Sequence, residues 1–414
     1  MHEKFNIIQK NMKRCNLNKF FENITKDLTD GYKTNHKNIT EFVFMGILNR
    51  MESLSEIVEY PTNVDICKNI TNTGDADTVR NCLSDVNSNL QLMFNEFNKL
   101  IKRMIKHIDI DNITYTTKNN YKIIPMELDG TDFFKSKTKT FNGNYITRKY
   151  TTKNGESTFN VFNGSVINTV GTNLKMILDV EYAKKQDGSN KNDCELSVYK
   201  RLIKRINKFF KDHNKLVIVD ALYSNSQFIN NCLNNNIHSL IRLKDNASTI
   251  IEEAEYDFLH FGSTKKKSFD KSLKPFGKIH HVDVYKTINT TFCGTPLYVY
   301  KFIEDDDIEH PMLCYTTCEI LSPYNVWFLM HKRWDQENIF ADLTKQYHIT
   351  HNYCGEAKEL INLLTLIAYN VTNILFVENE NLVAIVNGAK NYKATFKYFV
   401  KENLTEYIFS TVFI

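Results

Sequence analysis

The stretch SPYNVWFLMHKRWDQENIFADLTKQYHITHN, residues 322–352, places one carboxylate, Glu337, among basic and aromatic residues. Ser322 is a favourable helix N-cap, Pro323 suits the first helical position, and no further glycine or proline occurs before Gly355. We therefore expect one long helix. Apolar residues at spacings near three and four predict that one of its faces is buried. That face would carry Trp327, Phe328, Trp334, Ile339, Phe340 and Leu343.

Glu337 has two cations near it on this helix. Arg333 precedes it by one turn, and Lys345 follows it by about two turns on a similar side. A carboxylate between cations can also be a plain surface ion pair. The functional interpretation therefore depends on where other carboxylates fall.

Two apolar runs earlier in the chain end at aspartates. YKIIPMEL (121–128) is followed by Asp129, and LVIV (216–219), which is typical of a buried central strand, is followed by Asp220. Open α/β sheets bind ligands at the carboxyl ends of their strands, so both aspartates are site candidates. Asp132 competes with Asp129, which we prefer because it directly follows the strand.

Changes of pattern divide the chain into parts. Residues 1–115 are expected to form a helical domain. Residues 116–244 and 321–380 are expected to form an α/β core, interrupted at 245–320 by a β-rich insertion, and 381–414 to form a helical segment.

The N-terminal helices are clearest at 40–58 and 77–109, where apolar residues recur with helical spacing. Between these segments, Asp77 or Thr78 is expected to cap a short helix that carries Arg80. A short helix, a tight turn and a second helix can read DNA. The same unit can equally be a cap on the core, and both interpretations stay open.

Composition permits several classes of partner. Of 414 residues, 42% are hydrophobic and 24% charged, as in an ordinary globular protein, and the net charge of +4 allows a nucleic-acid partner without requiring one. Lysine and arginine gather at 135–153, 200–211 and 265–278. Each cluster would line either a phosphate-binding surface or a solvated face.

The cysteine pattern and the apolar runs indicate the cellular compartment in which the protein is expected. Nine scattered cysteines without a Cys-x-x-Cys pair favour reduced thiols over a disulfide framework. The first fifteen residues lack a long apolar run, so we expect no secretory signal. The apolar run at 360–376 is interrupted by asparagines and predicts a buried core helix, not a membrane span. We expect a cytoplasmic protein that associates with the nucleoid when it binds DNA.

Asp129, Asp220 and Glu337 come from two strand ends and a later helix. This order allows them to converge at one edge of a mixed sheet, where carboxylates would hold Mg²⁺. Two ions about 3.5–4 Å apart would activate a water or a 3′-hydroxyl for in-line attack on a phosphodiester. The pattern alone is weak, because a chain with 48 acidic residues offers many such triples.

Four segments are more specific: LDGTDFF, NKNDCELSVYKRL, VIVDALYSNSQF and RWDQENIFADLTKQYHITHN. They resemble successive blocks of the DDE transposases of bacterial insertion sequences, in the branch with a β-strand insertion before the final glutamate. The resemblance covers residues from about 120 to 375 and extends weakly over DTVRNCL. It implies an α/β fold, with a ribonuclease-H-like mixed-sheet core, a β-rich insertion and a preceding helical domain.

The resemblance also implies roles for particular residues. Asp129, Asp220 and Glu337 would be the catalytic residues and would bind two Mg²⁺ ions, for which Mn²⁺ can substitute. The partners would be double-stranded DNA, as transposon ends and as target, and a second copy of the chain in a homodimer, with no membrane. DNA contacts would come from Arg333, Lys345, Tyr223, Lys332 and Asn338, with support of the second aspartate as an alternative role for Tyr223.

The chain departs from the family pattern in three places. Met330 stands where many members have a tyrosine, and Lys345 follows the glutamate by eight residues where some members have seven. The two tryptophans, Trp327 and Trp334, lie on the expected helix, so no base-flipping residue is assigned in the insertion.

Three functions remain open. The first is an enzyme that cleaves transposon ends and transfers the strands to target DNA. The second is a catalytically silent or domesticated DNA-binding protein derived from a transposase. The third is a ribonuclease-H-like nuclease that cuts without strand transfer.

Overall fold

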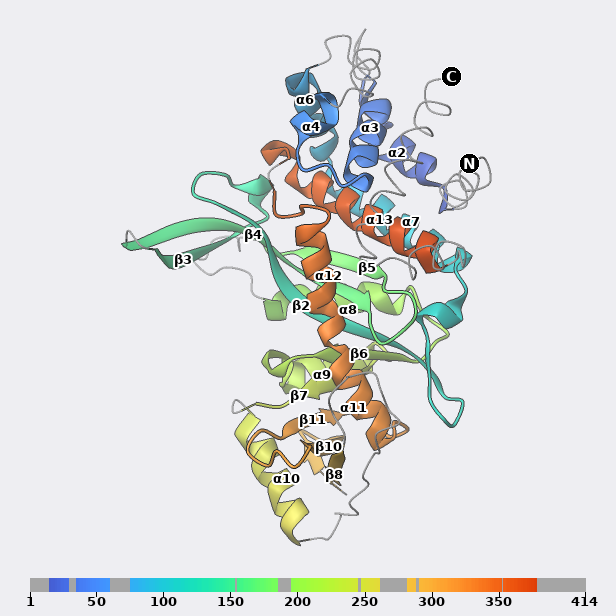
Figure 1. The fold of residues 1–414 in the computed structure, drawn as a ribbon, viewed down its shortest axis with the longest axis vertical. Helices are drawn as coiled ribbons and strands as arrows, with labels where there is room; N and C mark the ends of the chain where they lie inside the picture. The colour runs from blue at the N-terminus through green and yellow to red at the C-terminus, as the bar shows by residue number, and fades with distance from the viewer. Residues whose placement is uncertain are drawn as a thin grey trace.

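The computed structural model describes residues 15–29, 35–59, 75–152, 155–184, 195–244, 247–260, 281–287, 290–351 and 353–377. These residues form a mixed α/β fold, in which a group of helices stands at one end of a large sheet (Figure 1). The expected C-terminal helical segment at 381–414 and the basic cluster at 265–278 lie outside the described residues.

The N-terminal region is helical, as the sequence predicts. Its elements are α2 (Leu17–Thr25), α3 (His36–Leu48), α4 (Leu54–Glu59), α6 (Ala76–Asn87), α7 (Leu90–His107) and the 3₁₀ turn η1 (Ile110–Ile113). Each of the two expected long helices is divided, because Arg50 has a φ of 60° between α3 and α4, and the Asn89 side chain caps a new helix, α7. The predicted cap of α6 is wrong by a few residues, since Asp75 accepts the capping hydrogen bond from the backbone of Thr78.

Among the described residues, eleven strands form one sheet. They are β1 (Tyr115–Thr116), β2 (Lys122–Ser136), β3 (Ile146–Thr152), β4 (Gly155–Thr169), β5 (Ile177–Tyr182), β6 (Lys215–Val219), β7 (His238–Arg242), β8 (Val282–Lys286), β9 (Thr290–Phe292), β10 (Thr295–Glu304) and β11 (Met312–Thr316). The main order is β3-β4-β2-β6-β7-β11-β10-β8, with β2, β6 and β7 parallel and antiparallel strands on both sides. The strands of the expected insertion therefore extend the core sheet through the pairing of β11 with β7.

β2 is longer than the sequence predicts. The apolar pattern predicts an end at Asp129, but the strand continues to Ser136 because β4 pairs with it along this length. β6 pairs with β2 only as far as Glu127. Asp129 thus lies inside β2, just past the point where the strand loses its parallel neighbour. Beyond it, β3 and the adjoining parts of β2 and β4 form a ribbon that projects from the body of the molecule (Figure 1).

Helices cover both faces of the parallel strands. The helices of this part of the chain are α8 (Glu195–Asn207), α9 (Ser226–Asn234), α10 (Ser248–His260), α11 (Pro323–Lys332), α12 (Trp334–Lys345) and α13 (Lys358–Val377), with the 3₁₀ turns η2 (Phe141–Gly143), η3 (Ala221–Tyr223) and η5 (Gly355–Ala357). Of these, α9 and α11 contact β7. Leu216 and Ile218 of β6 belong to an apolar cluster with α11, whereas Val217 and Val219 belong to a second cluster with α8 and α9. Because successive strand residues point to opposite faces, α11 lies on the face of Leu216 and Ile218.

α13 joins the N-terminal helices to the sheet. It contacts α3, α6 and α7 as well as β5 and α12 (Figure 1). The helix with its preceding turn is long and apolar enough to cross a membrane, but 83% of its most apolar window is buried inside the protein. α13 packs against the N-terminal helices on one side and the sheet on the other, and this accounts for its apolar sequence. The finding agrees with the predicted core helix.

The stretch predicted as one long helix is two helices, α11 and α12, that meet at Arg333. Ser322 caps α11 through a reciprocal capping box with Asn325. The N–H of Arg333 bonds to the carbonyl of Met330, three residues back, so the helix tightens at the junction. The prediction that Trp334 lies on the buried face is wrong, because 54% of this residue is exposed.

Candidate active site

Asp129 of β2 and Asp220, which directly follows β6, both lie just past the last paired residues of these two strands. Each parallel pair between β2 and β6 joins residues 91 positions apart, and the last is Glu127 with Ile218 (218 − 127 = 91). The two aspartates follow this pair with the same separation (220 − 129 = 91). Neighbouring strands are about 4.7–4.9 Å apart, so the two aspartates start from adjacent backbone positions.

By the alternation of side chains along a strand, both aspartates fall on the face of the sheet that α11 covers. Ile123 of β2 and Ile218 of β6 pack in the α11 cluster. Residues separated by an even number of positions in a strand share a face, so Glu127 and Asp129 lie on the side of Ile123, and Asp220 follows on the side of Ile218. The two acids therefore share an edge and a face.

Glu337 comes to this region from α12. Half of its side chain is exposed, and its Oε1 lies 3.7 Å from Nη2 of Arg333. Arg333 is 14% exposed, and its Nη1 donates a hydrogen bond of 3.4 Å to Oε1 of Glu127. Glu127 is two positions from Asp129 on β2. One guanidinium therefore connects the helix of Glu337 with the strand of Asp129.

Glu127 is a fourth carboxylate of this group, and no local sequence pattern singles it out. Only 1% of its side chain is exposed. Burial raises the pKa of Glu127 well above its usual range, the charge of Arg333 opposes this shift, and the charges of Asp129, Asp335 and Glu337 add to it. Asp129 and Glu337 thus lie within electrostatic reach of one buried acid. The available sequence signal was an acid inside an apolar strand.

Asp335 anchors α12 to the sheet. Its carboxylate accepts hydrogen bonds from the backbone N–H of Gly171 at 3.1 Å and from Nζ of Lys175 at 2.8 Å, both in the connection between β4 and β5. Gly171 has a φ of 66°, and a Cβ at this position would press against Leu329 and Lys332 of α11. The positive φ and the close approach of this turn to α11 therefore both favour glycine at this position.

The three predicted carboxylates are held by separate local partners. Oδ1 of Asp129 accepts a hydrogen bond from the N–H of Gly130 at 2.8 Å, and Oδ1 of Asp220 accepts one from Leu222 at 2.9 Å. Across the described ranges, no three His, Cys, Asp or Glu side chains form a group that could hold a metal ion. The carboxylates share a region but do not converge on one point in this conformation. Their oxygen-only donor set nevertheless fits a hard divalent cation such as Mg²⁺.

Asp132, the competitor of Asp129, has a different setting. Both of its carboxylate oxygens lie 2.8 Å from Nη1 of Arg148, and Asn163 donates a further hydrogen bond of 2.7 Å. Three positions from Asp129, it points to the opposite face of β2. This placement favours Asp129 as the partner of Asp220.

The residues expected to contact DNA differ in exposure. Lys345 and Asn338 are exposed on α12, while Lys332 is partly buried. Tyr223 is fully buried against the aromatic rings of Tyr199 and Phe228. Its burial favours the alternative role, support of the turn that follows Asp220.

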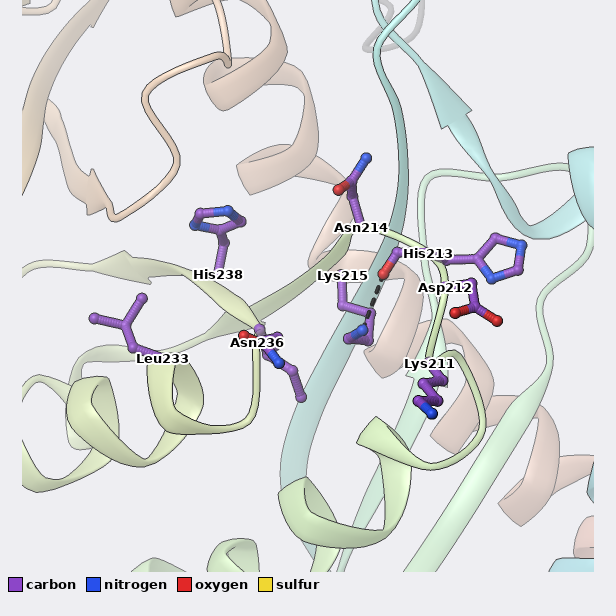
Figure 2. Close-up of a pocket in the computed structure, with 9 residues that line it drawn as sticks. Lys211, Asp212, His213, Asn214, Lys215, Leu233, Asn236 and His238 are labelled. Atoms are coloured by element: carbon purple, nitrogen blue, oxygen red, sulfur yellow. Dashed lines mark hydrogen bonds between the residues drawn. The ribbon is translucent and has the colours of Figure 1, made fainter.

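A hollow of about 460 Å³ lies at the other end of the parallel strands (Figure 2). Lys211, His213 and His238 line it, and Lys215 turns its Nζ to the backbone carbonyls of Phe210 and His213. These residues precede β6 and β7 or begin them. Ligands of parallel sheets bind at the carboxyl ends of strands, so this hollow is separate from the acidic group.

Residues 126–371 match the family described as Transposase DDE domain. The matched segment is more than half of the chain and contains Asp129, Asp220 and Glu337. No curated protein matches the chain.

Proposed function

Because the chain belongs to the transposase DDE domain family, we propose that it is an active transposase that cleaves DNA at the ends of a mobile element and transfers the strands to target DNA. Membership supports a DNA-binding transposase that depends on divalent metal ions. The chain also has the mixed α/β fold with a ribonuclease-H-like core that the resemblance implies. The activity is supported most directly by the places of Asp129 and Asp220, which both follow the last paired residues of β2 and β6, Glu127 and Ile218.

In this proposal Asp129, Asp220 and Glu337 hold two Mg²⁺ ions, for which Mn²⁺ can substitute. When bound, the ions supply activation of the attacking hydroxyl or water and stabilisation of the leaving oxygen. The aspartates provide ligands from the sheet, and Glu337 provides one from α12. The site would therefore depend on the seating of α12 against the sheet, to which the hydrogen bonds of Asp335 contribute.

DNA would lie along the exposed side of α12. Asn338 and Lys345 share the exposed side of the helix with Glu337, and both would contact phosphates next to the cleaved bond. Lys332 and Arg333 precede them at the helix junction, and the exposed part of the Arg333 guanidinium would face the phosphate nearest Glu337. Tyr223 would contribute indirectly, by supporting the turn after Asp220.

The projecting ribbon would continue this DNA surface. Lys135 and Lys137 are exposed, and their Nζ atoms lie 4.8 Å and 5.5 Å from the ring centres of Tyr150 and Phe159. Cations interleaved with aromatic rings suit a DNA backbone. Lys135 is six residues beyond Asp129, about 20 Å at about 3.3 Å per residue. The ribbon would thus contact phosphates about six base pairs from the cleavage point.

The working assembly would be a homodimer on double-stranded DNA. Two ends of an element must be held together while both are joined to one target. A single copy provides one group of Asp129, Asp220 and Glu337, so two copies provide one group for each end.

The test uses a plasmid that carries the coding region with its natural flanking DNA, where the ends of the element lie. With Mg²⁺, the purified wild-type chain should cleave these ends and join them to a second plasmid. Asp129→Asn, Asp220→Asn and Glu337→Gln should each lower cleavage by more than about a hundredfold, since loss of an outer-shell partner alone typically costs about 10- to 100-fold. DNA affinity should remain.

Asp212→Asn is the matched control, because Asp212 is an exposed acid at the opposite end of the same strands. Cleavage that survives the three active-site substitutions would contradict the proposed site. Cleavage by the wild type without joining would favour a nuclease. Specific DNA binding without cleavage would favour a catalytically silent DNA-binding protein.

A further inference from the structure

Glu127 is an acid where the sheet favours an apolar residue. It is paired with Ile218 of β6 on one side and Asn168 of β4 on the other, and it is almost completely buried. Its Oε2 has no hydrogen-bond partner among the described residues, and its Oε1 accepts one from Arg333. An apolar residue would pack here at a lower cost than a partly satisfied carboxylate. Stability alone therefore does not explain Glu127.

Arg333 lies between two carboxylates. Its Nη1 is 3.4 Å from Glu127, its Nη2 is 3.7 Å from Glu337, and its buried Nε has no hydrogen-bond partner in the part of the chain that is described. Arg333 is also the residue between α11 and α12. The position of this side chain therefore helps to set where Glu337, in the first turn of α12, lies relative to β2.

We propose that Glu127 is a positioning residue, which holds the guanidinium of Arg333 against β2 so that Arg333 holds the carboxylate of Glu337 on the side of Asp129 and Asp220. This role rests on the proposed function, because it takes Glu337 as catalytic. Glu127 itself does not touch DNA and transfers no proton. Glutamine can replace it, because the amide oxygen accepts the same hydrogen bond, whereas alanine cannot.

Chemical modification of Arg333 tests the positioning without catalysis. Phenylglyoxal reacts with accessible guanidinium groups, and peptide mass spectrometry gives its rate at each arginine. Glu127→Ala should raise the rate at Arg333 by about tenfold or more, because it removes the hydrogen bond that the charged guanidinium donates to Glu127. Glu127→Gln should leave the rate close to that of the wild type. An unchanged rate in Glu127→Ala would overturn the proposal.

Glu96→Ala is the matched control for this experiment. It also removes a buried carboxylate paired with a cation, Lys99, but in the N-terminal helices. It should lower the unfolding midpoint without changing the rate at Arg333. If Glu96→Ala raises the modification rate at Arg333 by the same factor, the cause is a general loosening of the fold. This result would also overturn the proposal.

Cleavage kinetics connect the position of Arg333 with the reaction. Glu127→Ala should lower the single-turnover rate at saturating DNA by about 10- to 100-fold, as for other outer-shell partners. Glu127→Gln should restore most of the rate. The double variant with Arg333→Ala should be no slower than Arg333→Ala alone, because both changes act through one guanidinium.

If the rate losses of Glu127→Ala and Arg333→Ala multiply in the double variant, Glu127 acts independently of Arg333. This result would overturn the proposal. Failure of the proposed function has a different signature. If the wild-type chain does not cleave DNA, the modification rates at Arg333 still decide whether Glu127 holds this residue.

Discussion

We propose that side chains on the exposed side of α12 contact DNA. Trp334 stands one turn before Glu337, and more than half of its surface is exposed. Trp327, by contrast, is buried, and its Nε1 donates to Glu304. A large aromatic surface open to solvent beside the proposed catalytic acid would suit the stacking of an unpaired base.

We expect Trp334→Ala to weaken binding to DNA with unpaired bases at the cleavage point by roughly 1–3 kcal/mol, the range for one base stacked on an aromatic ring. Trp334→Phe should retain most of the affinity. Fluorescence anisotropy with labelled duplexes measures both. Equal affinities for the wild type and Trp334→Ala would exclude stacking on this ring.

The sequence singles out the proposed metal ligands of the candidate site, but not the buried residues behind them. Asp129, Asp220 and Glu337 follow from strand and helix patterns, because each lies near an apolar run that can be read locally. Glu127 does not, because its partner Arg333 is 206 positions away and their contact depends on the packing of α12. The burial of Tyr223 depends in the same way on rings of α8 and α9.

At the scale of elements, the seating of α12 depends on Asp335. This carboxylate is nearly buried and satisfies the N–H of Gly171, while Lys175 balances its charge. The contact ties the first turn of α12 to the connection between β4 and β5. Loss of this contact would affect both the stability of the fold and the position of Glu337.

Asp335→Ala should lower the free energy of unfolding by about 1–3 kcal/mol, because it leaves a backbone donor without its partner. Cleavage should fall further than the loss of folded protein explains. Urea unfolding and single-turnover cleavage measure the two effects. Thr344→Ala changes an exposed residue of the same helix and is the control. Equal stability of the two variants would contradict the anchoring role.

Element boundaries mark where local patterns stop being informative. β2 extends past Asp129 because β4 pairs with it, and a pairing between distant segments leaves no mark in the hydrophobic pattern of either strand. The junction at Arg333 carries no glycine or proline. It arises from a hydrogen bond to Met330 three residues back, which propensities do not reveal.

For the whole molecule, the sequence predicts the fold class and the helical N-terminal region correctly. It does not predict that the strands at 282–316 continue the core sheet, because pairing between β7 and β11 is decided by the exposed edge of β7. α13 completes the assembly by packing against both the N-terminal helices and β5. The first residue of α13, Lys358, is a buried cation, and its effect on the free energy of unfolding depends on pH.

The Lys358 ammonium donates to the carbonyls of Ile349 and His351. Burial lowers its pKa from 10.5 to about 7, although the charge of Glu359 opposes the shift. Between these values the unfolded chain binds more protons at Lys358 than the folded chain. Its contribution to stability therefore rises with pH from about 7 to 10.5 and is constant below that window.

We expect the free energy of unfolding of the wild type, relative to Lys358→Met, to increase as the pH is raised from 7 to 10. Urea titrations of both proteins at several pH values give this difference, in which other titrating groups largely cancel. A difference that stays constant over this range would mean that the buried lysine keeps its ordinary pKa.

The most direct measurement of whether Asp129, Asp220 and Glu337 surround the same cations is iron-directed cleavage of the chain. Fe²⁺ can take the place of Mg²⁺ at oxygen ligands, and with ascorbate and peroxide it generates radicals that cut the backbone beside those ligands. On plasmid DNA carrying the flanking sequences, we predict cuts near residues 129, 220 and 337, all suppressed by excess Mg²⁺ and by Asp129→Asn. Cuts confined to one of these segments, or unchanged in Asp129→Asn, would show that the three acids do not form one site.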